Sequence, residues 1–256
     1  MIHASAIIDA DARLAADVEI GPYSVIGAGV EIDSGTVIGP HVVVNGPCKI
    51  GRDNRIFQFA SVGEMPQDKK YNGEPTTLVI GDRNTIRECV TLNRGTTGGI
   101  GTTTIGNDNL FMAYSHIAHD CIVGNHCIFA NGSSLAGHVE VGDYAILGGF
   151  ALVHQFTHIG TRAFCGMGSV ITRDIPPFST AAGGRAKVIG INKEGLRRNG
   201  FSPELIRALH KSFRELLKSK APKQDVFKNL EPLCSEYPEV EVFVNFIKNS
   251  ERGIAS

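Results

Sequence analysis

The sequence lacks several features that mark other classes of protein. It contains no tryptophan, and its longest apolar run, residues 145–153, includes two glycines and is far too short to span a bilayer. Residues 1–14 lack the basic start and the apolar stretch of a signal peptide. Basic and acidic residues nearly balance, 25 against 26, so charge gives no indication of nucleic-acid binding. We therefore expect a cytoplasmic protein without membrane insertion.

The most prominent feature of the sequence is an apolar residue at every sixth position. The series is unbroken over residues 105–171, and earlier series occupy residues 2–62 and 80–92. A period of six fits neither an α-helix nor a single strand. It is typical of hexapeptide repeats, in which short strands turn at regular corners and three repeats close one coil of about 18 residues. We therefore expect a mostly β protein, a left-handed parallel β-helix, in which Cys165 is a small core residue rather than a disulfide partner.

Two polar segments interrupt the series, at residues 64–77 and 94–103. The repeat is intact on either side of each, so we expect both to leave the β-helix as loops, a position that often serves binding.

The periodicity changes after Ile171. Ser202 and Pro203 form a good helix start, with Ser at the N-cap and Pro in the first turn, and apolar residues follow at helical spacing. Pro222 stops this helix, and two more are expected over roughly 223–235 and 239–249. The sequence thus predicts a β-helix over residues 1–190 and a small C-terminal α-helical domain over residues 191–256.

Four of the nine histidines fall near one edge of the predicted prism. Residues one coil apart are vertical neighbours, and His138 lies 19 residues after His119 and 16 before His154, with His116 three before His119. This stacking favours a functional site over isolated surface histidines. A triangular prism also closes naturally into a ring of three, so we expect a homotrimer with this edge at or near a subunit boundary.

The residues around these histidines resemble a known family. The segments His116-Ile-Ala-His119-Asp120-Cys121, Ala136-Gly137-His138 and Val153-His154-Gln155-Phe156, Gln67-Asp68-Lys69-Lys70-Tyr71 in the first insertion, and residues 190–198 are similar to the UDP-N-acetylglucosamine acyltransferases of lipid A biosynthesis. The resemblance implies an O-acyltransferase of EC 2.3.1 type that needs no cofactor and no metal. It implies transfer of a 3-hydroxyacyl chain from acyl carrier protein to the 3-hydroxyl of UDP-N-acetylglucosamine.

The resemblance also implies roles for individual residues. His119 is the general base, Asp120 orients its imidazole, and the backbone N–H of Gly137 stabilises the oxyanion. The implied substrate contacts are Asp68 and Lys70 for the sugar and phosphate region, His116, His138, His154 and Gln155 along the cleft, and Asn192, Glu194 and Arg198 for the nucleotide.

Met167 is implied to lie at the far end of the acyl groove, where Gly accompanies longer chains. A Met side chain reaches about 4–5 Å, and each methylene it excludes loses about 0.8 kcal/mol of burial. We therefore expect a preference for a 3-hydroxydecanoyl over a 3-hydroxytetradecanoyl donor. The repeat puts Met167 on a different edge from its own subunit's His119, and in a trimer a neighbouring subunit can bring that edge to the same cleft. The alternative is a Met that merely fills a gap.

Other readings stay open at this point. Carbonic anhydrases of the γ class share this fold and bind zinc through three histidines shared between neighbouring subunits, two of them on one coil. Here His154 and His158 lie on one coil, with His119 two coils below. Another hexapeptide-repeat acyltransferase and a non-catalytic scaffold are further alternatives.

For the acidic carrier protein, the expected docking residues are Arg162, Arg173 and Arg214.

Overall fold

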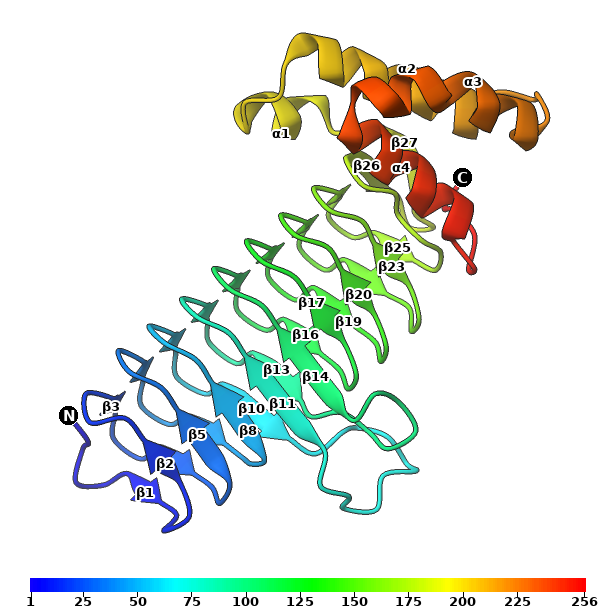
Figure 1. Ribbon diagram of the computed structural model, residues 1–256. Helices are drawn as coiled ribbons and strands as arrows, with labels where there is room; N and C mark the ends of the chain where they lie inside the picture. Colours follow the sequence, from blue (N-terminus) through cyan, green and yellow to red (C-terminus); the bar gives the residue numbers. More distant parts are fainter.

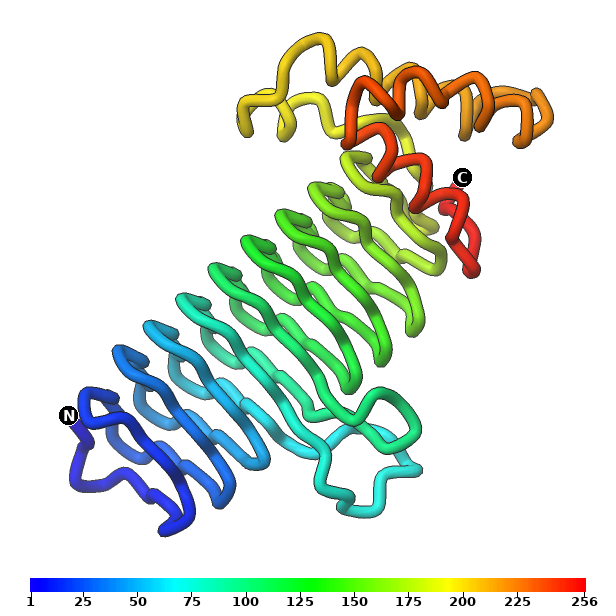
Figure 2. The backbone as a smooth tube through the Cα atoms, viewed as in Figure 1, coloured from blue at the N-terminus to red at the C-terminus, as the bar shows by residue number.

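The computed structural model describes residues 1–256 and forms a tall triangular prism with helices at its C-terminal end (Figure 1). Successive strands pass around the prism, so each sheet contains every third strand, paired in parallel with the next coil. The backbone trace shows these coils stacked along one axis (Figure 2). The repeat therefore predicts the fold class correctly.

Each face of the prism is one sheet. The first sheet contains β1 (Ile7–Ile8), β4 (Val25–Ile26), β7 (Val43–Val44), β10 (Ser61–Glu64), β13 (Thr91–Asn93), β16 (His116–Ile117), β19 (Ser134–Leu135), β22 (Leu152–Val153) and β25 (Val170–Ile171). The second contains β2 (Arg13–Leu14), β5 (Val30–Ile32), β8 (Cys48–Ile50), β11 (Thr77–Ile80), β14 (Thr102–Ile105), β17 (Ile122–Val123), β20 (Glu140–Val141) and β23 (His158–Ile159). The third contains β3 (Glu19–Ile20), β6 (Val37–Ile38), β9 (Arg55–Ile56), β12 (Thr85–Ile86), β15 (Leu110–Phe111), β18 (Ile128–Phe129), β21 (Ile146–Leu147), β24 (Phe164–Cys165), β26 (Ser179–Ala182) and β27 (Lys187–Ile191).

The repeat positions form the core of the prism. From Ile20 to Ile171 every apolar residue of the period-six series is buried, Cys165 among them. Burying one such aliphatic side chain contributes about 1.5–3 kcal/mol. The first coil differs, since Ile2 is 48% exposed and Ile8 and Leu14 are half-buried. No coil lies beneath them to cover their side chains.

A column of buried asparagines fixes the corner between the second and third sheets. The backbone N–H of Asn109 donates to Asn84 Oδ1 at 2.9 Å, and the N–H of Asn84 donates to Asn54 Oδ1 at 2.9 Å. Backbone groups at a corner leave the strand pairing, so these side chains supply the partners that burial demands.

Both insertions leave the prism at the corner between the first and second sheets. The first lies between β10 and β11 and the second between β13 and β14, and the two loops project on the same side (Figures 1 and 2). They also contact one another, since Arg94 Nη2 donates to the Tyr71 hydroxyl at 3.2 Å. The two coils that carry them lie directly before the coil of β16, which carries His116.

The predicted C-terminal helices are confirmed as α2 (Pro203–Leu217), α3 (Lys223–Glu236) and α4 (Pro238–Asn249). Two further features have no clear signal in the sequence. After Ile171 the sequence predicts no further strand, yet β26 and β27 form there, pair antiparallel and cover the last coil of the third sheet. The short helix α1 (Lys193–Arg198) follows, and its N-cap Asn192 accepts the Gly195 N–H at 3.1 Å.

The boundary expected between residues 190 and 191 falls inside β27, because this strand passes directly from the prism into the helical part. None of the helices combines the length and the apolar character that crossing a membrane would require.

The chain end after α4 folds back onto the last coils through a buried carboxylate. Asp174 Oδ1 accepts the backbone N–H of His158 at 2.9 Å, and Asp174 Oδ2 accepts the Ser250 hydroxyl at 2.6 Å. Arg252 Nε donates to the Thr172 carbonyl at 3.0 Å. The C-terminal residues are thereby held beside the edge that carries the histidines.

Candidate active site

The candidate site lies at the corner where β16, β19 and β22 lead into β17, β20 and β23. We call residues 118–121, 136–139 and 154–157 the histidine corner. Two columns run through it, one of His119, Gly137 and Gln155, the other of Asp120, His138 and Phe156. The second column has left-handed backbone angles, with φ of 58°, 62° and 60°. Pairing between coils fixes this conformation, since the N–H of His138 donates to the His119 carbonyl at 3.0 Å.

His119 and Asp120 form a direct pair. His119 Nδ1 lies 2.8 Å from Asp120 Oδ2. An ionised carboxylate only accepts hydrogen bonds, so Nδ1 carries the proton and Nε2 keeps its lone pair. The imidazole is partly accessible, whereas the Asp120 carboxylate is fully covered, with 16% and 0% of the two side chains exposed. This is the geometry of a base oriented by a buried acid.

The second insertion supplies the remaining partners of the Asp120 carboxylate. The Thr96 hydroxyl donates to Oδ2 at 2.6 Å, the Thr96 N–H lies 3.1 Å from both oxygens, and the Gly101 N–H donates to Oδ1 at 3.0 Å. The Asp120 N–H donates to Thr103 Oγ1 at 2.8 Å. Hydrogen bonds to a charged group contribute about 1.5–3 kcal/mol each, so these donors hold the carboxylate ionised and in place.

Burial and hydrogen bonding act in opposite directions on Asp120. Burial raises the pKa of its carboxyl group, but the hydrogen bonds from Thr96 and His119 outweigh burial and hold that pKa below its usual value. Asp120 is therefore negatively charged at neutral pH and stabilises a proton on the His119 imidazole when one is taken up.

Two further histidines surround this pair. The His138 ring meets the His119 ring edge-on at 5.0 Å between centroids and stacks on Phe156 at 4.3 Å. Burial lowers the pKa of His138, although the negative charge of Asp120 raises it by a smaller amount. Burial also lowers the pKa of His116. His116 Nδ1 lies 2.6 Å from Thr91 Oγ1. Both rings are therefore expected to be neutral near pH 7 and able to donate or accept hydrogen bonds with a polar ligand.

Gly137 lies one coil above His119 and leaves room for its ring. Its N–H has no hydrogen-bond partner within the subunit, although its carbonyl accepts the Phe156 N–H at 3.1 Å. The N–H groups of His119 and Gln155 are also without a partner, so a free N–H is a property of this corner position. Gly137 is special because it combines that free donor with the absence of a side chain beside the imidazole.

Hollows flank the histidine corner on both sides. On the first sheet a hollow of about 430 Å³ is lined by Gln67, His116, His119 and Gly137 among others. On the second sheet a larger one of about 960 Å³ runs from Ile100 past His138 to Arg252. An extended substrate can therefore reach the His119 imidazole from either face.

The other predicted contacts from this part of the chain lie close by. Asp68 is in the first insertion, where its carboxylate accepts the Lys70 N–H at 3.0 Å, and its charge raises the pKa of His138 against the larger effect of burial. The Lys70 side chain is exposed. His154 and Gln155 are exposed on the next coil, and Arg252 Nη2 lies 2.8 Å from His154 Nδ1.

The structure does not bring the remaining predicted residues to the same corner. Asn192 Nδ2 donates to the carbonyl of Arg162, which lies at the corner between the second and third sheets. Glu194 pairs with Arg197 at 2.9 Å and with Arg198 at 3.0 Å on the surface of α1. Met167 follows β24 at the corner between the third and first sheets and is 81% exposed, so it fills no gap in its own subunit.

Sequence reasoning missed three residues of the site. Thr96 and Phe156 carry no chemical signal of their own, although Phe156 lies 18 residues after His138, the spacing of one coil. Arg252 belongs to the returning chain end, and nothing in its local sequence predicts a contact with His154.

The zinc set considered from the sequence does not assemble in the subunit. His158 lies on β23 in the second sheet and pairs with Glu140 at 3.3 Å, whereas His154 is on the first-sheet side of the corner. The group whose possible ligand atoms lie within 4.8 Å of one another is His119, Asp120 and His138. Asp120 already accepts several hydrogen bonds, so this group is better suited to orienting a base than to binding a metal ion.

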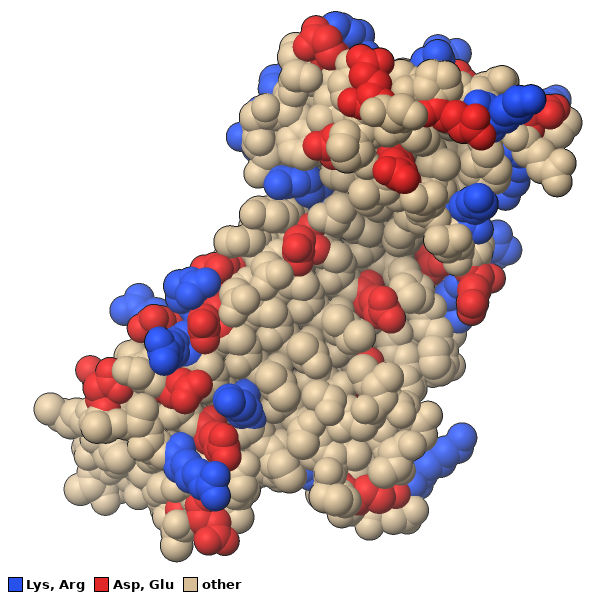
Figure 3. All heavy atoms as spheres, in the orientation of Figure 1, with Lys and Arg blue, Asp and Glu red and all other residues tan.

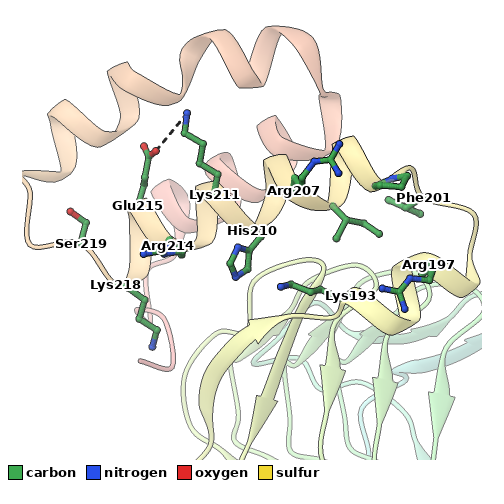
Figure 4. A pocket seen from close by; sticks show the side chains of 12 residues that line it. Lys193, Arg197, Phe201, Arg207, His210, Lys211, Arg214, Glu215, Lys218 and Ser219 are labelled. Carbon is green, nitrogen blue, oxygen red and sulfur yellow. Dashed lines mark ion pairs between the residues drawn. The ribbon is translucent and has the colours of Figure 1, made fainter.

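Charge is unevenly distributed over the molecule. On the face shown in Figure 3, charged side chains gather on the N-terminal coils and on the helices, and the middle coils carry few. A groove of about 740 Å³ between α1 and α2 is lined by many cationic side chains, and Lys193 and His210 face each other across it (Figure 4). Arg214 and Lys218 in this groove have no ion-pair partner, whereas Lys211 pairs with Glu215 at 3.9 Å.

Comparison with known proteins gives matches along the chain. Residues 174–255 match the family model described as UDP N-acetylglucosamine O-acyltransferase, domain 2, and residues 1–34 and 102–137 match the bacterial transferase hexapeptide model. The chain is 58% identical over 253 residues to the acyl-(acyl-carrier-protein)–UDP-N-acetylglucosamine O-acyltransferase of Halorhodospira halophila, covering 99% of this chain and 98% of that protein. The corresponding protein of Stutzerimonas stutzeri is 52% identical over 254 residues, with the same coverage.

Solved structures agree with these sequence matches. LpxA from Acinetobacter baumannii superposes with a TM-score of 0.97 at 45% identity, covering 100% of this chain and 99% of that chain. The UDP-N-acetylglucosamine O-acyltransferase of Moraxella catarrhalis gives a TM-score of 0.96 at 42% identity, with the same coverage. The similarity therefore extends over the β-helix, both insertions and the C-terminal helices.

Proposed function

Since the chain belongs to the family of acyl-(acyl-carrier-protein)–UDP-N-acetylglucosamine O-acyltransferases, we propose that the histidine corner performs this acyl transfer, with His119 as the general base. The donor is a 3-hydroxyacyl chain on acyl carrier protein, and the acceptor is the 3-hydroxyl of UDP-N-acetylglucosamine. The product enters lipid A biosynthesis as its first intermediate. We expect the protein to act in the cytoplasm.

The single observation that carries this proposal is the His119–Asp120 pair. Asp120 binds Nδ1–H, so Nε2 is free to remove the proton from the sugar hydroxyl as its oxygen attacks the thioester carbonyl. The negative charge that develops on that carbonyl oxygen is stabilised by the free N–H of Gly137. When the intermediate collapses, the C–S bond breaks and His119 returns the proton to the departing thiolate.

A homotrimer would complete the site, and the exposed apolar residues support one. The outward positions of the first sheet include Ile7, Val43, Leu152 and Val170, and its corner with the third sheet carries Tyr23, Phe59, Tyr114 and Phe150, all exposed. Exposed apolar side chains gathered on one face and its edge are typical of a protein interface. Threefold rotation about an axis facing the first sheet brings the Met167 corner of one subunit beside the histidine corner of the next.

This arrangement also accounts for the distance of Met167 from His119 within one subunit. Met167 would then limit the acyl chain bound at the neighbour's His119, and Asn192, Glu194 and Arg198 would reach the nucleotide from another subunit. On this basis we propose a preference for 3-hydroxydecanoyl donors.

The carrier protein is acidic, so the cationic groove between α1 and α2 is its proposed docking surface. Arg214 lies in this groove, as the sequence analysis expects of a docking residue. Arg162 is a poor candidate, because its guanidinium stacks over the Tyr144 ring at 4.0 Å and the Phe201 ring at 5.0 Å. Arg173 is exposed on the last coil, and we propose it as a second contact for the carrier protein.

One assay tests the function as a whole. The purified protein is incubated with UDP-N-acetylglucosamine and a panel of 3-hydroxyacyl carrier proteins, and the product is analysed by mass. We expect a singly O-acylated nucleotide sugar, with the 3-hydroxydecanoyl donor used fastest. Absence of any acylated product from folded protein with every donor would overturn the proposal, and zinc-dependent hydration of carbon dioxide would favour the lyase.

A further inference from the structure

The loop of the second insertion, residues 94–101, forms a cover over Asp120. Three of its groups donate to the carboxylate: the hydroxyl of Thr96 at 2.6 Å, the N–H of Thr96 at 3.1 Å and the N–H of Gly101 at 3.0 Å. Thr96 is itself buried at 6% exposure. Its hydroxyl and His119 Nδ1 both donate to the same oxygen, Oδ2.

We propose that Thr96 is a positioning residue for the His119–Asp120 pair, and that its hydroxyl holds the carboxylate oxygen in the direction of His119 Nδ1. The inference rests on the proposed role of His119 as the base. It assigns a function in the reaction to the second insertion, which otherwise contributes no ionisable group to the pair.

The physical reason is that a carboxylate that accepts few hydrogen bonds can rotate and exchange one hydrogen-bond donor for another. His138 Nδ1 lies 4.0 Å from Asp120 Oδ2, so a small rotation of the carboxylate would exchange His119 for His138. The donors from Thr96 and Gly101 hold both oxygens of the carboxylate and thereby oppose that rotation. The ionisable groups facing Asp120 are His119 and His138 at the corner and the Cys121 thiol inside the prism; the loop contributes none.

The test compares three side chains at one position with a matched control. Thr96→Val keeps the shape but removes the hydroxyl, Thr96→Ala removes it without placing a methyl group against the carboxylate, and Thr96→Ser keeps it. Thr97→Val removes a hydroxyl from the next residue, which is exposed and makes one long hydrogen bond, at 3.5 Å, to Glu74 Oε1. We expect kcat to fall about tenfold to a hundredfold in the Val and Ala variants, with the KM for UDP-N-acetylglucosamine nearly unchanged. The Ser and Thr97 variants should stay near the wild type.

A pH profile separates positioning from simple loss of stability. The Thr96 hydroxyl lowers the pKa of Asp120 against the effect of burial, so its removal raises that pKa. His119 and Asp120 are hydrogen-bonded and bind protons as a coupled pair, so a carboxylate that binds a proton more readily should move the acidic limb of the kcat/KM profile to higher pH in Thr96→Val and Thr96→Ala, but not in Thr97→Val. An unshifted limb, an equal loss in Thr97→Val, or no rescue by Thr96→Ser would overturn the inference.

His119→Ala in the same assay distinguishes a wrong role for Thr96 from a wrong role for His119. If it is inactive and Thr96→Val turns over like the wild type, only the role of Thr96 is wrong. If His119→Ala itself keeps wild-type turnover, the proposed base is wrong and the role of Thr96 falls with it.

Discussion

A Cβ atom added to Gly137 would lie 2.5 Å from Cε1 and 2.7 Å from Nε2 of His119. The imidazole thus occupies the space that a side chain at 137 would fill. The corner backbone itself does not need glycine, because the equivalent corner positions carry Ala28 on an early coil and Gln155 on the next coil. Gly137 therefore serves the His119 ring rather than the turn.

Gly137→Ala is expected to displace the His119 ring and lower kcat by about a hundredfold, because misplacing a catalytic group by about 1 Å has effects of this size. Thermal unfolding should show only a modest loss of stability, since the ring can move toward solvent. Gly184→Ala is the control, because an added Cβ there has no atom within 4 Å. Equal activity of the two variants would contradict the assignment.

His119→Ala should reduce turnover by about 10²–10⁴, the usual contribution of a general base. Binding of UDP-N-acetylglucosamine, measured by calorimetry, should survive in part because the other contacts remain. A purified variant with near-wild-type turnover would show that another group takes the proton.

Gly99→Ala tests the cover over Asp120 from the side of the loop. Its added Cβ would lie 2.4 Å from Asp120 Cγ, so the carboxylate or the loop has to shift. We expect kcat to fall at least about tenfold. At Gly98 the nearest atom to an added Cβ is Thr96 Oγ1 at 4.0 Å, so Gly98→Ala should behave like the wild type. Steady-state kinetics on both variants decides the point.

Met167→Gly should increase the use of longer donors. Each methylene newly accommodated gains about 0.8 kcal/mol, so kcat/KM for the 3-hydroxytetradecanoyl donor should rise by about tenfold or more. Competition between donors of different length, followed by mass analysis, measures the change. An unaltered preference would remove Met167 from the acyl site.

Docking of the carrier protein should depend on salt and on Arg214. Raising the ionic strength should raise the KM for the acyl carrier protein, because screening weakens attraction between exposed charges. Arg214→Ala should raise that KM by at least about threefold at low salt. Arg207→Ala is the comparison, since Arg207 lines the same groove but is paired with Glu204 at 2.6 Å. A salt-independent KM would argue against the groove.

The sequence by itself determined the β-helix and much of the histidine corner. A strict period of six leaves one arrangement of the chain, so the stacking of His119 beneath Gly137 and His138 follows from their spacing. The helices α2 and α4 were predictable because each has apolar residues at helical spacing, and α3 because a proline bounds it on each side.

Only the tertiary structure decided what completes the site. Thr96 and Gly101 reach Asp120 from an insertion that has no period, so nothing local predicts which of its groups face the carboxylate. The contact of Arg252 with His154 joins residues 98 positions apart. The helix α1 was hidden by its short length and lies at a different corner from His119. A repeat fixes positions along the coil, whereas loops and chain ends are placed by the long-range contacts they make.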